Sequence, residues 1–255
     1  MDSILQKIVD SKRREVEACR VNGVYLRLPE SRRTPLSFKR TLVEGSGIIA
    51  EFKRRSPSKG EIHPMADVAK VVKGYSLNGA SCCSILTDTP FFGGALTDLA
   101  VARQVAPSTP LLRKEFIVDA DQIREAAATG ADAVLLIASV LDKDEMNSFT
   151  TVAHDFGLEV LCEVHSVEEL DRVPVNADMV GINNRNLATF DTDISRSSMI
   201  ASQLPESMIK VAESGIRTMA EVRCLRHEGY TGFLIGETFM RHNEPAEALK
   251  NFLNE

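Results

Sequence analysis

Charged side chains stand at the ends of several short apolar runs in this 255-residue sequence. Glu51 and Lys53 end the first run, and Lys114 and Glu163 end two later ones. A lysine ammonium group can donate a proton and a carboxylate can accept one, so side chains of these types suit general acid–base catalysis. Without a metal, an ammonium group can also stabilise negative charge that develops on an oxygen.

A second group of polar residues suits the binding of anions. Asn183 and Arg185 follow a later apolar run, and Ser56 lies in the basic segment Lys53–Lys59. Each residue alone has an ordinary structural explanation, because charge runs and single strand-end cations are commonly solvated surface groups. Ionisable or amide groups at the ends of four separate runs are harder to explain by structure. Together they favour a shared site.

The apolar runs have the length and composition of buried strands, and segments with helical periodicity lie between them. Several of these segments stop at a glycine, as helices commonly do. Strands rich in Val, Ile and Leu that alternate with helices predict a parallel sheet covered on both faces. The eight predicted strands are Gly47–Phe52, Ser81–Leu86, Pro110–Arg113, Ala133–Ile137, Glu159–Glu163, Met179–Ile182, Ile209–Ala212 and Gly232–Ile235.

Eight strand–helix units predict an α/β fold, a (β/α)8 TIM barrel, with an open doubly wound sheet as the second choice. Such a barrel takes about 250 residues, so residues 1–255 are expected to form a single domain. Residues 1–45 precede the first strand and are expected to form an N-terminal helical extension, with a helix over Ile4–Cys19. Catalytic side chains of such barrels gather at the carboxyl ends of the strands, where the charged residues stand.

The last two strand ends carry small residues. Ser214 and Gly215 follow the seventh strand, and Gly236 and Glu237 follow the eighth. Loops at these two positions, together with a short helix N-terminus, form the usual phosphate site of such barrels. The alternative is that these segments are only tight turns. The barrel context favours a small phosphorylated molecule as the substrate.

The composition narrows the class of protein. A net charge of −6 gives no reason to expect nucleic acid as a partner. No apolar run approaches the ~18 residues of a membrane span, and the N-terminus lacks a signal-peptide core. The five cysteines show no disulfide or zinc pattern. We expect a cytoplasmic protein with reduced thiols, without membrane contact or cofactor, and a monomer is the simplest oligomeric state.

Metal binding is not expected either. The five histidines show no ligand spacing. His165 follows the fifth strand and can approach the barrel mouth, while His154 and His227 lie in predicted helices, where an imidazole faces outwards by default.

The strand-end motifs resemble those of the indole-3-glycerol-phosphate synthase family of the tryptophan pathway. The likeness is collinear and covers nearly the whole chain. Its specific motifs are AEFKRRSPSKG (Ala50–Gly60) and LRKEFIVD (Leu112–Asp119). Further matches are LCEVH (Leu161–His165), GINNRNL (Gly181–Leu187), AESGI (Ala212–Ile216) and LIGETFM (Leu234–Met240).

The resemblance implies a carboxy-lyase that closes an indole ring on 1-(2-carboxyphenylamino)-1-deoxyribulose 5-phosphate. The products would be indole-3-glycerol phosphate, carbon dioxide and water. Lys114 would be the general acid at the substrate ketone, and Glu163 would transfer a proton during the loss of water. Lys53 would contact substrate anions, the phosphate included, and act as a second acid. Glu51 would hold and tune Lys53.

The same resemblance implies the binding residues. Asn183 and Arg185 would line the site near the developing charge and the substrate carboxylate, and Ser56 would also contact that carboxylate. Which of Asn183 and Asn184 faces the substrate is left open. The pocket for the aromatic ring would comprise Phe92, Phe116 and Leu135, and the phosphate-binding positions would be Ser214, Gly215, Gly236 and Glu237.

Two further expectations concern the side chain of Glu237 and the pKa of Lys114. Glu237 stands where some relatives carry Ser, so its side chain is expected to turn away from the phosphate. Partial desolvation and neighbouring cations are expected to lower the pKa of Lys114 towards a useful value.

Two other functions compete with this one. The sugar-phosphate isomerase one step earlier in the pathway needs an acid and a base, but not the carboxylate-binding residues Ser56 and Arg185. A barrel that has lost activity and serves as a binding subunit would not need its intact Lys53, Lys114 and Glu163.

Overall fold

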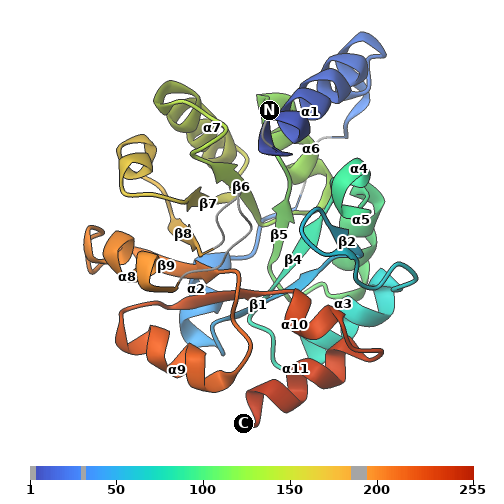
Figure 1. Ribbon diagram of the computed structural model, residues 1–255. Coiled ribbons are helices and arrows are strands. Elements are labelled where there is room, and N and C mark those ends of the chain that lie inside the picture. Colours follow the sequence, from blue (N-terminus) through green and yellow to red (C-terminus); the bar gives the residue numbers. More distant parts are fainter. Residues whose placement is uncertain (1–3, 30–32, 185–193) are drawn as a thin grey trace.

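Eight parallel strands close into a barrel with helices around its outside (Figure 1). The computed structural model describes residues 4–29, 33–184 and 194–255. Each strand pairs with its neighbour in the chain, and β10 returns to pair with β1, with Ile49 opposite Leu234. The predicted TIM barrel is confirmed, and the open doubly wound sheet is wrong because no edge is left unpaired between the first and last barrel strands.

The barrel strands begin and end within one residue of their predicted positions. Runs of β-branched and leucine residues bounded by turn residues define them well, because they are buried on both faces. The strands are β1 (Ile48–Phe52), β4 (Cys82–Leu86), β5 (Leu111–Lys114), β6 (Ala133–Ile137), β7 (Glu159–Val164), β8 (Met179–Asn183), β9 (Ile209–Glu213) and β10 (Gly232–Ile235).

Several of the helices start at side-chain caps. Asp142 with Glu145, and Thr218 with Glu221, form reciprocal capping boxes at the starts of two of them. The helices are α1 (Ile4–Val21), α2 (Phe38–Glu44), α3 (Val68–Leu77), α4 (Thr89–Phe92), α5 (Leu96–Val105), α6 (Ala120–Thr129), α7 (Lys143–Asp155), α8 (Ile194–Ser202), α9 (Met219–His227), α10 (Glu237–Met240) and α11 (Pro245–Leu253), with 3-10 turns η1 (Tyr25–Arg27) and η2 (Glu168–Arg172).

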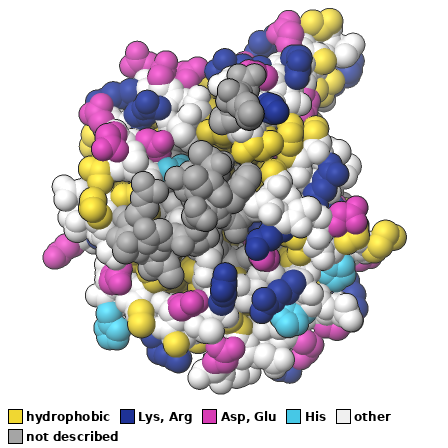
Figure 2. All heavy atoms as spheres, viewed as in Figure 1, with side chains coloured by type: hydrophobic (Ala, Val, Ile, Leu, Met, Phe, Trp, Pro, Cys, Tyr) yellow, Lys and Arg dark blue, Asp and Glu magenta, His cyan; other side chains and the backbone are white. Residues whose placement is uncertain are grey.

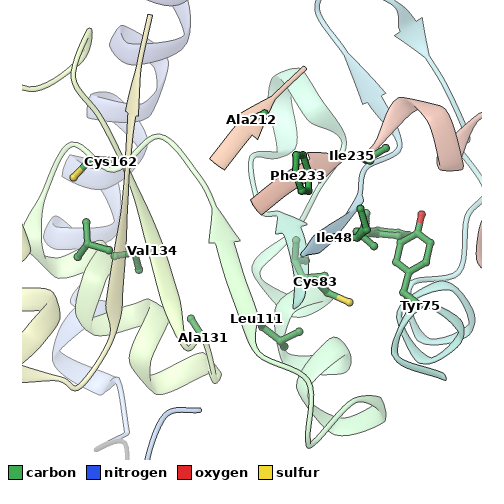
Figure 3. Packing of buried hydrophobic residues seen from close by; sticks show 14 of the residues in the cluster. Ile48, Tyr75, Cys83, Leu111, Ala131, Val134, Cys162, Ala212, Phe233 and Ile235 are labelled. Atoms are coloured by element: carbon green, nitrogen blue, oxygen red, sulfur yellow. The ribbon is translucent and has the colours of Figure 1, made fainter. Parts of the chain in front are cut away.

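Two apolar layers hold the barrel together. One lies between strands and helices, as Figure 3 shows where Tyr75 of α3 packs towards Ile48 of β1. The other fills the inside of the barrel, and Phe38 and Leu42 of α2 close it at the amino-terminal ends of the strands, here called the foot. Alternate residues of each strand serve the two layers, since successive side chains point to opposite faces.

Two features near the opposite end, the mouth, were not predicted from sequence. After β1 the basic segment folds into a small antiparallel hairpin of β2 (Arg55–Ser56) and β3 (Gly60–Glu61). The helix α1 buries Ile8 and Val16, and between them, on the same face, it buries Lys12. Both segments reach the mouth, where Ile4, Leu5 and Ile8 of α1 and residues 56–59 of the hairpin line a cavity.

Candidate active site at the barrel mouth

A cavity of about 440 Å³ opens at the carboxyl ends of the strands, and every barrel strand contributes to its wall. Most of the residues predicted for the site line it. Arg185 lies outside the described residues. Those that line the cavity are Glu51, Lys53, Ser56, Phe92, Lys114, Phe116, Leu135, Glu163, Asn183, Ser214, Gly215, Gly236 and Glu237.

Strand alternation explains why the charged side chains meet. Ile49 belongs to the inner apolar layer, so Glu51, two residues further along β1, also points inwards and reaches the mouth. The intervening Phe52 is fully buried in the outer layer. Leu112 and Leu161 set the same direction for Lys114 and Glu163. The inside of the barrel is therefore apolar at the foot and ionisable at the mouth.

Lys114 lies at the centre of a cluster of carboxylates. Its Nζ is 2.6 Å from Glu163 Oε2 and 3.0 Å from Glu213 Oε2. Burial alone would lower the pKa of Lys114, but the negative charges of Glu163, Glu213 and Glu51 outweigh it and raise the pKa above its ordinary value. The expectation of a lowered pKa was wrong, because carboxylates and not cations surround the ammonium group.

The cation next to Lys114 in the sequence does not approach the Lys114 ammonium group. Arg113 points to the outside of the barrel, where its Nη2 donates to Glu125 at 2.7 Å. A cation adjacent in sequence is therefore separated from the Lys114 ammonium by the strand itself.

Glu213 is a site residue that the sequence did not single out. Its side chain is 1% exposed, and its Oε1 accepts no hydrogen bond from the part of the chain that the structure describes. Burial, together with the negative charge of Glu163, raises the pKa of Glu213 to about 8 even though Lys114 acts in the opposite direction. Glu213 therefore holds its proton more firmly than an ordinary glutamate does, and more firmly than Glu163.

Two glycines make room for these carboxylates. A Cβ on Gly181 of β8 would collide with Oε1 of Glu213, and a Cβ on Gly236 would collide with Oε1 of Glu51. The absence of a side chain at both positions lets carboxylates from neighbouring strands reach the cavity.

Partners at both carboxylate oxygens keep Glu163 in its ionised form. Asn183 donates its Nδ2 to Glu163 Oε1 at 3.0 Å, and His165 Nε2 lies 3.2 Å from the same oxygen. Burial would raise the pKa of Glu163, but the positive charges of Lys114 and His165 hold it well below its usual range. Burial opposes the charge on His165, yet Glu163 and Glu169 raise its pKa to about 10.

The structure shows which of the two amides, Asn183 or Asn184, faces the cavity. Asn183 lines the cavity, whereas Asn184 turns away from it and donates its Nδ2 to the carbonyl oxygen of Ser214 at 2.9 Å. Asn184 therefore supports the turn after β9.

Lys53 and Glu51 form a second ion pair at the mouth, with 2.6 Å between Nζ and Oε1. Both side chains are largely buried. Glu51 therefore acts on both lysines, since it pairs with Lys53 and its charge also helps to raise the pKa of Lys114.

An apolar wall bounds one side of the cavity. The rings of Phe92 and Phe116 lie 5.9 Å apart between centroids, tilted by 35°. Ile4, Leu5 and Ile8 of α1 continue this wall. In Figure 2 hydrophobic side chains gather where the start of α1 meets the barrel. A flat aromatic group fits this wall better than a sugar does.

The opposite side has small residues and cations. Ser214 has a φ of 68° and Gly215 a φ of 84°, so the chain turns sharply after β9. Thr238 donates its hydroxyl to the Ile216 carbonyl at 2.7 Å and ties this turn to α10. The Oε1 atom of Glu237 lies 3.7 Å from Lys59 Nζ. Among the described residues that line this side, the cations are Lys59, Arg217 and Arg241.

A model of the indole-3-glycerol phosphate synthase family matches residues 5–252. The indole-3-glycerol phosphate synthase of Bacteroides thetaiotaomicron is 48% identical to the chain and covers 99% of it and 98% of its own length. The one from Koribacter versatilis is 41% identical over 99% of the chain and 100% of its own length.

The chain belongs to the indole-3-glycerol phosphate synthase family. The predicted activity of that family, a carboxy-lyase of tryptophan biosynthesis, is confirmed by these matches. So is the prediction of a phosphorylated substrate. The sugar-phosphate isomerase and the inactive barrel were therefore wrong as alternatives.

Solved structures of other proteins share the fold at low identity. The 3-hexulose-6-phosphate synthase of Salmonella typhimurium has a TM-score of 0.62 at 16% identity, covering 82% of this chain and 97% of its own. The thiamine phosphate pyrophosphorylase of Pyrococcus furiosus has a TM-score of 0.60 at 16% identity, covering 86% and 96%. These likenesses concern the barrel alone, and the activity of an indole-3-glycerol phosphate synthase rests on the family match.

Residues 4–29, 33–184 and 194–255 include no group of three or more His, Cys, Asp or Glu side chains placed to hold a metal ion. Among the helices of these ranges, none has the length and apolarity that a membrane crossing requires.

Proposed function

We propose that this cavity closes the indole ring on 1-(2-carboxyphenylamino)-1-deoxyribulose 5-phosphate, with Lys114 as the acid of the first step. The placement of the Lys114 ammonium supports the proposal. It stands among three carboxylates, between an apolar wall with Phe92 and Phe116 and a turn of small residues with cations around it. The aromatic ring would lie on the first and the phosphate at the second, at Ser214 and Gly215.

In the first step the ring carbon that carries the carboxylate attacks the ketone carbon of the sugar chain. A carbon–carbon bond forms, and the carbonyl electrons move to the oxygen, which takes a proton from Lys114. The raised pKa of Lys114 keeps it protonated at neutral pH. Transfer remains favourable, because an alkoxide is a far stronger base than an amine. The nearby ammonium also stabilises the charge as it develops.

Carbon dioxide then leaves, and the electrons of the broken carbon–carbon bond restore the aromatic ring. The new hydroxyl departs as water with a proton from Lys53, whose pairing with Glu51 at 2.6 Å fixes its position. The carbon beside the nitrogen loses a proton to Glu163, which is ionised and therefore able to accept it. The products are indole-3-glycerol phosphate, carbon dioxide and water.

The substrate's carboxylate needs a place among three protein carboxylates. A protonated Glu213 reduces the repulsion, and we assign it this role because its pKa is raised to about 8. Ser56, largely buried in the cavity wall, would donate to the same carboxylate. Arg185, which lies outside the described residues, is proposed as its cationic partner from the resemblance alone.

Replacement of Lys114 by alanine tests the first step. We expect kcat to fall by about 100-fold or more, as for the loss of a general acid. Indole fluorescence follows the reaction, and the protein's lack of tryptophan keeps the background low. Lys39→Ala is the matched control, since Lys39 pairs with Asp178 at 2.7 Å at the foot. A turnover of Lys114→Ala equal to that of Lys39→Ala would remove Lys114 from the mechanism.

We also propose that the chain acts as a monomer in the cytoplasm. Every barrel strand of the chain contributes to the cavity wall, so a second copy is not needed to build it, and the five cysteines are free thiols. Light scattering of the active protein tests the first point, and a dimeric mass would reject it. Reaction with a thiol reagent before and after reduction tests the second.

A further inference from the structure

Lys12 of α1 is a buried cation that the reaction does not use. Its side chain is 2% exposed, in the middle of the apolar face of the helix. Removing an ammonium group from water is costly unless carboxylates compensate for it. Its Nζ lies 2.8 Å from Glu15 of the same helix, and 3.2 Å from both Asp88 and Glu115 of the barrel.

Asp88 connects Lys12 to one aromatic residue of the cavity. It caps α4, and its Oδ1 accepts from the backbone N–H groups of Phe91 and Phe92 at 2.8 and 3.2 Å. Its other oxygen, Oδ2, faces Lys12 and accepts no hydrogen bond within the described residues. The position of Phe92 therefore depends on a carboxylate whose second oxygen is held by Lys12.

Glu115 connects Lys12 to the other aromatic residue. Its Oε1 accepts from the backbone N–H of Phe116 at 2.8 Å, and its Oε2 accepts from the Thr87 hydroxyl at 2.7 Å. Arg113 Nη2 is 4.0 Å from Oε2, at the limit of an ion pair, and is engaged with Glu125 at 2.7 Å. Lys12 is thus the close cation of Glu115.

The third element is α1 itself. One turn before Lys12, Ile8 lines the cavity, and so do Ile4 and Leu5. A single ammonium group therefore joins the three segments that form the apolar wall: α1, the start of α4 and the segment after β5.

We infer that Lys12 is a positioning residue that sets the affinity of the cavity for the aromatic half of the substrate. It does so by holding Phe92, Phe116 and α1 in one arrangement. The inference rests on the proposed function, in which these side chains receive the aromatic ring. Without Lys12, two buried carboxylates would face each other without their cation, and the segments that carry the wall would move apart.

The test uses two competitive inhibitors that represent the two halves of the substrate: 2-aminobenzoate and ribulose 5-phosphate. In Lys12→Met we expect the inhibition constant of 2-aminobenzoate to rise by about tenfold or more, the value of one charge-assisted contact. That of ribulose 5-phosphate should stay within about twofold. The KM of the full substrate should rise more than kcat falls.

Two further variants serve as controls. Arg20→Met removes another attachment of α1, the ion pair with Asp119 at 2.6 Å, which touches neither aromatic residue. It should leave both inhibition constants near those of the wild type. Asp88→Asn keeps an oxygen to cap α4 but removes the charge opposite Lys12. It should weaken the binding of 2-aminobenzoate, as Lys12→Met should. It also tests the inference if Lys12→Met does not fold.

The outcomes separate the two proposals. If Phe92→Ala and Phe116→Ala leave 2-aminobenzoate inhibition unchanged, the aromatic pocket of the proposed function is wrong. If those variants weaken it but Lys12→Met and Asp88→Asn do not, only the role of Lys12 is wrong. Equal weakening of both inhibitors by Lys12→Met would also overturn the inference, because it would indicate a general loss of structure.

Discussion

The two ends of the barrel both bury carboxylates, but they supply them with different partners. At the foot, Asp132 is 0% exposed, and each of its oxygens accepts two hydrogen bonds. The donors are the guanidinium groups of Arg33 and Arg103 and the backbone N–H groups of Leu36 and Leu111. Buried charges with this many fixed donors stabilise a fold.

At the mouth the burial is similar, yet the donors are few. Glu213 is 1% exposed and Glu163 3% exposed, and they share the single ammonium group of Lys114. Burial alone therefore does not distinguish a structural carboxylate from one that we propose to be catalytic. The number of donors does: Glu213 Oε1 accepts no hydrogen bond from the described residues, which leaves it open to a substrate group or a proton.

The largest effect should come from the foot. Asp132→Ala leaves two guanidinium groups and two N–H groups without their acceptor, so we expect the free energy of unfolding to fall by about 3 to 5 kcal/mol. Urea unfolding followed by circular dichroism measures this loss. The kcat of the molecules that remain folded should match that of the wild type. A stable Asp132→Ala with impaired kcat would reverse the assignment of the two ends.

At the mouth, Glu163→Gln should behave in the opposite way. It removes the proton acceptor that we propose for the dehydration step, so we expect kcat to fall by about 100-fold. The free energy of unfolding should change much less than in Asp132→Ala, because the amide can keep a hydrogen bond. Steady-state kinetics and urea unfolding on the same preparation give both numbers. A large loss of stability without a loss of kcat would make Glu163 a structural residue.

The raised pKa of Glu213 predicts the pH dependence of the wild type. Its proton is bound below about pH 8 and lost above it, so kcat/KM should decrease as the pH rises through this value. The decrease reflects the free enzyme, in which an ionised Glu213 repels the substrate carboxylate. In Glu213→Gln the decrease should vanish from this pH range. An unchanged alkaline limb in that variant would assign the titration to another group.

The smallest effect should follow from His165→Asn. The loss of the imidazole removes one of the charges that keep the pKa of Glu163 low, so the acidic limb of the kcat profile should move to higher pH. We expect kcat on the acidic limb to fall by about threefold to tenfold, as for a shift of up to about one pKa unit, while kcat near neutral pH stays within about twofold because Glu163 remains ionised there. His154→Asn is the control, because His154 pairs with Asp178 at the foot at 2.8 Å. Identical pH profiles for both variants would contradict this role.

The positions of the strands followed from the sequence because each is short, β-branched and bounded by turn residues. Once eight parallel strands close, the residues at their carboxyl ends must meet, so the convergence of Lys53, Lys114 and Glu163 was predictable. The ion pairs between these side chains were not predictable from the sequence. Lys114 and Glu213 are 99 residues apart, and only the register between strands shows that they touch.

Other features were missed for physical reasons of the same kind. Glu213 precedes a turn of small residues, and that turn suggested phosphate binding for the whole segment. Lys12 occupies an apolar helix face on which a lysine is unexpected, and only its three-dimensional contacts with Asp88 and Glu115 explain it. Sequence patterns predict which face a residue occupies, but not which distant charges share that face.

The site also depends on two uncharged residues, the glycines that lie beside its carboxylates. At Gly181 or Gly236, one added methyl group would occupy the space of Glu213 or Glu51. A relative could thus keep all its ionisable residues and still lose the arrangement through a change to alanine. In this barrel, the vacant volume beside a strand is as necessary to the site as the acids that it accommodates.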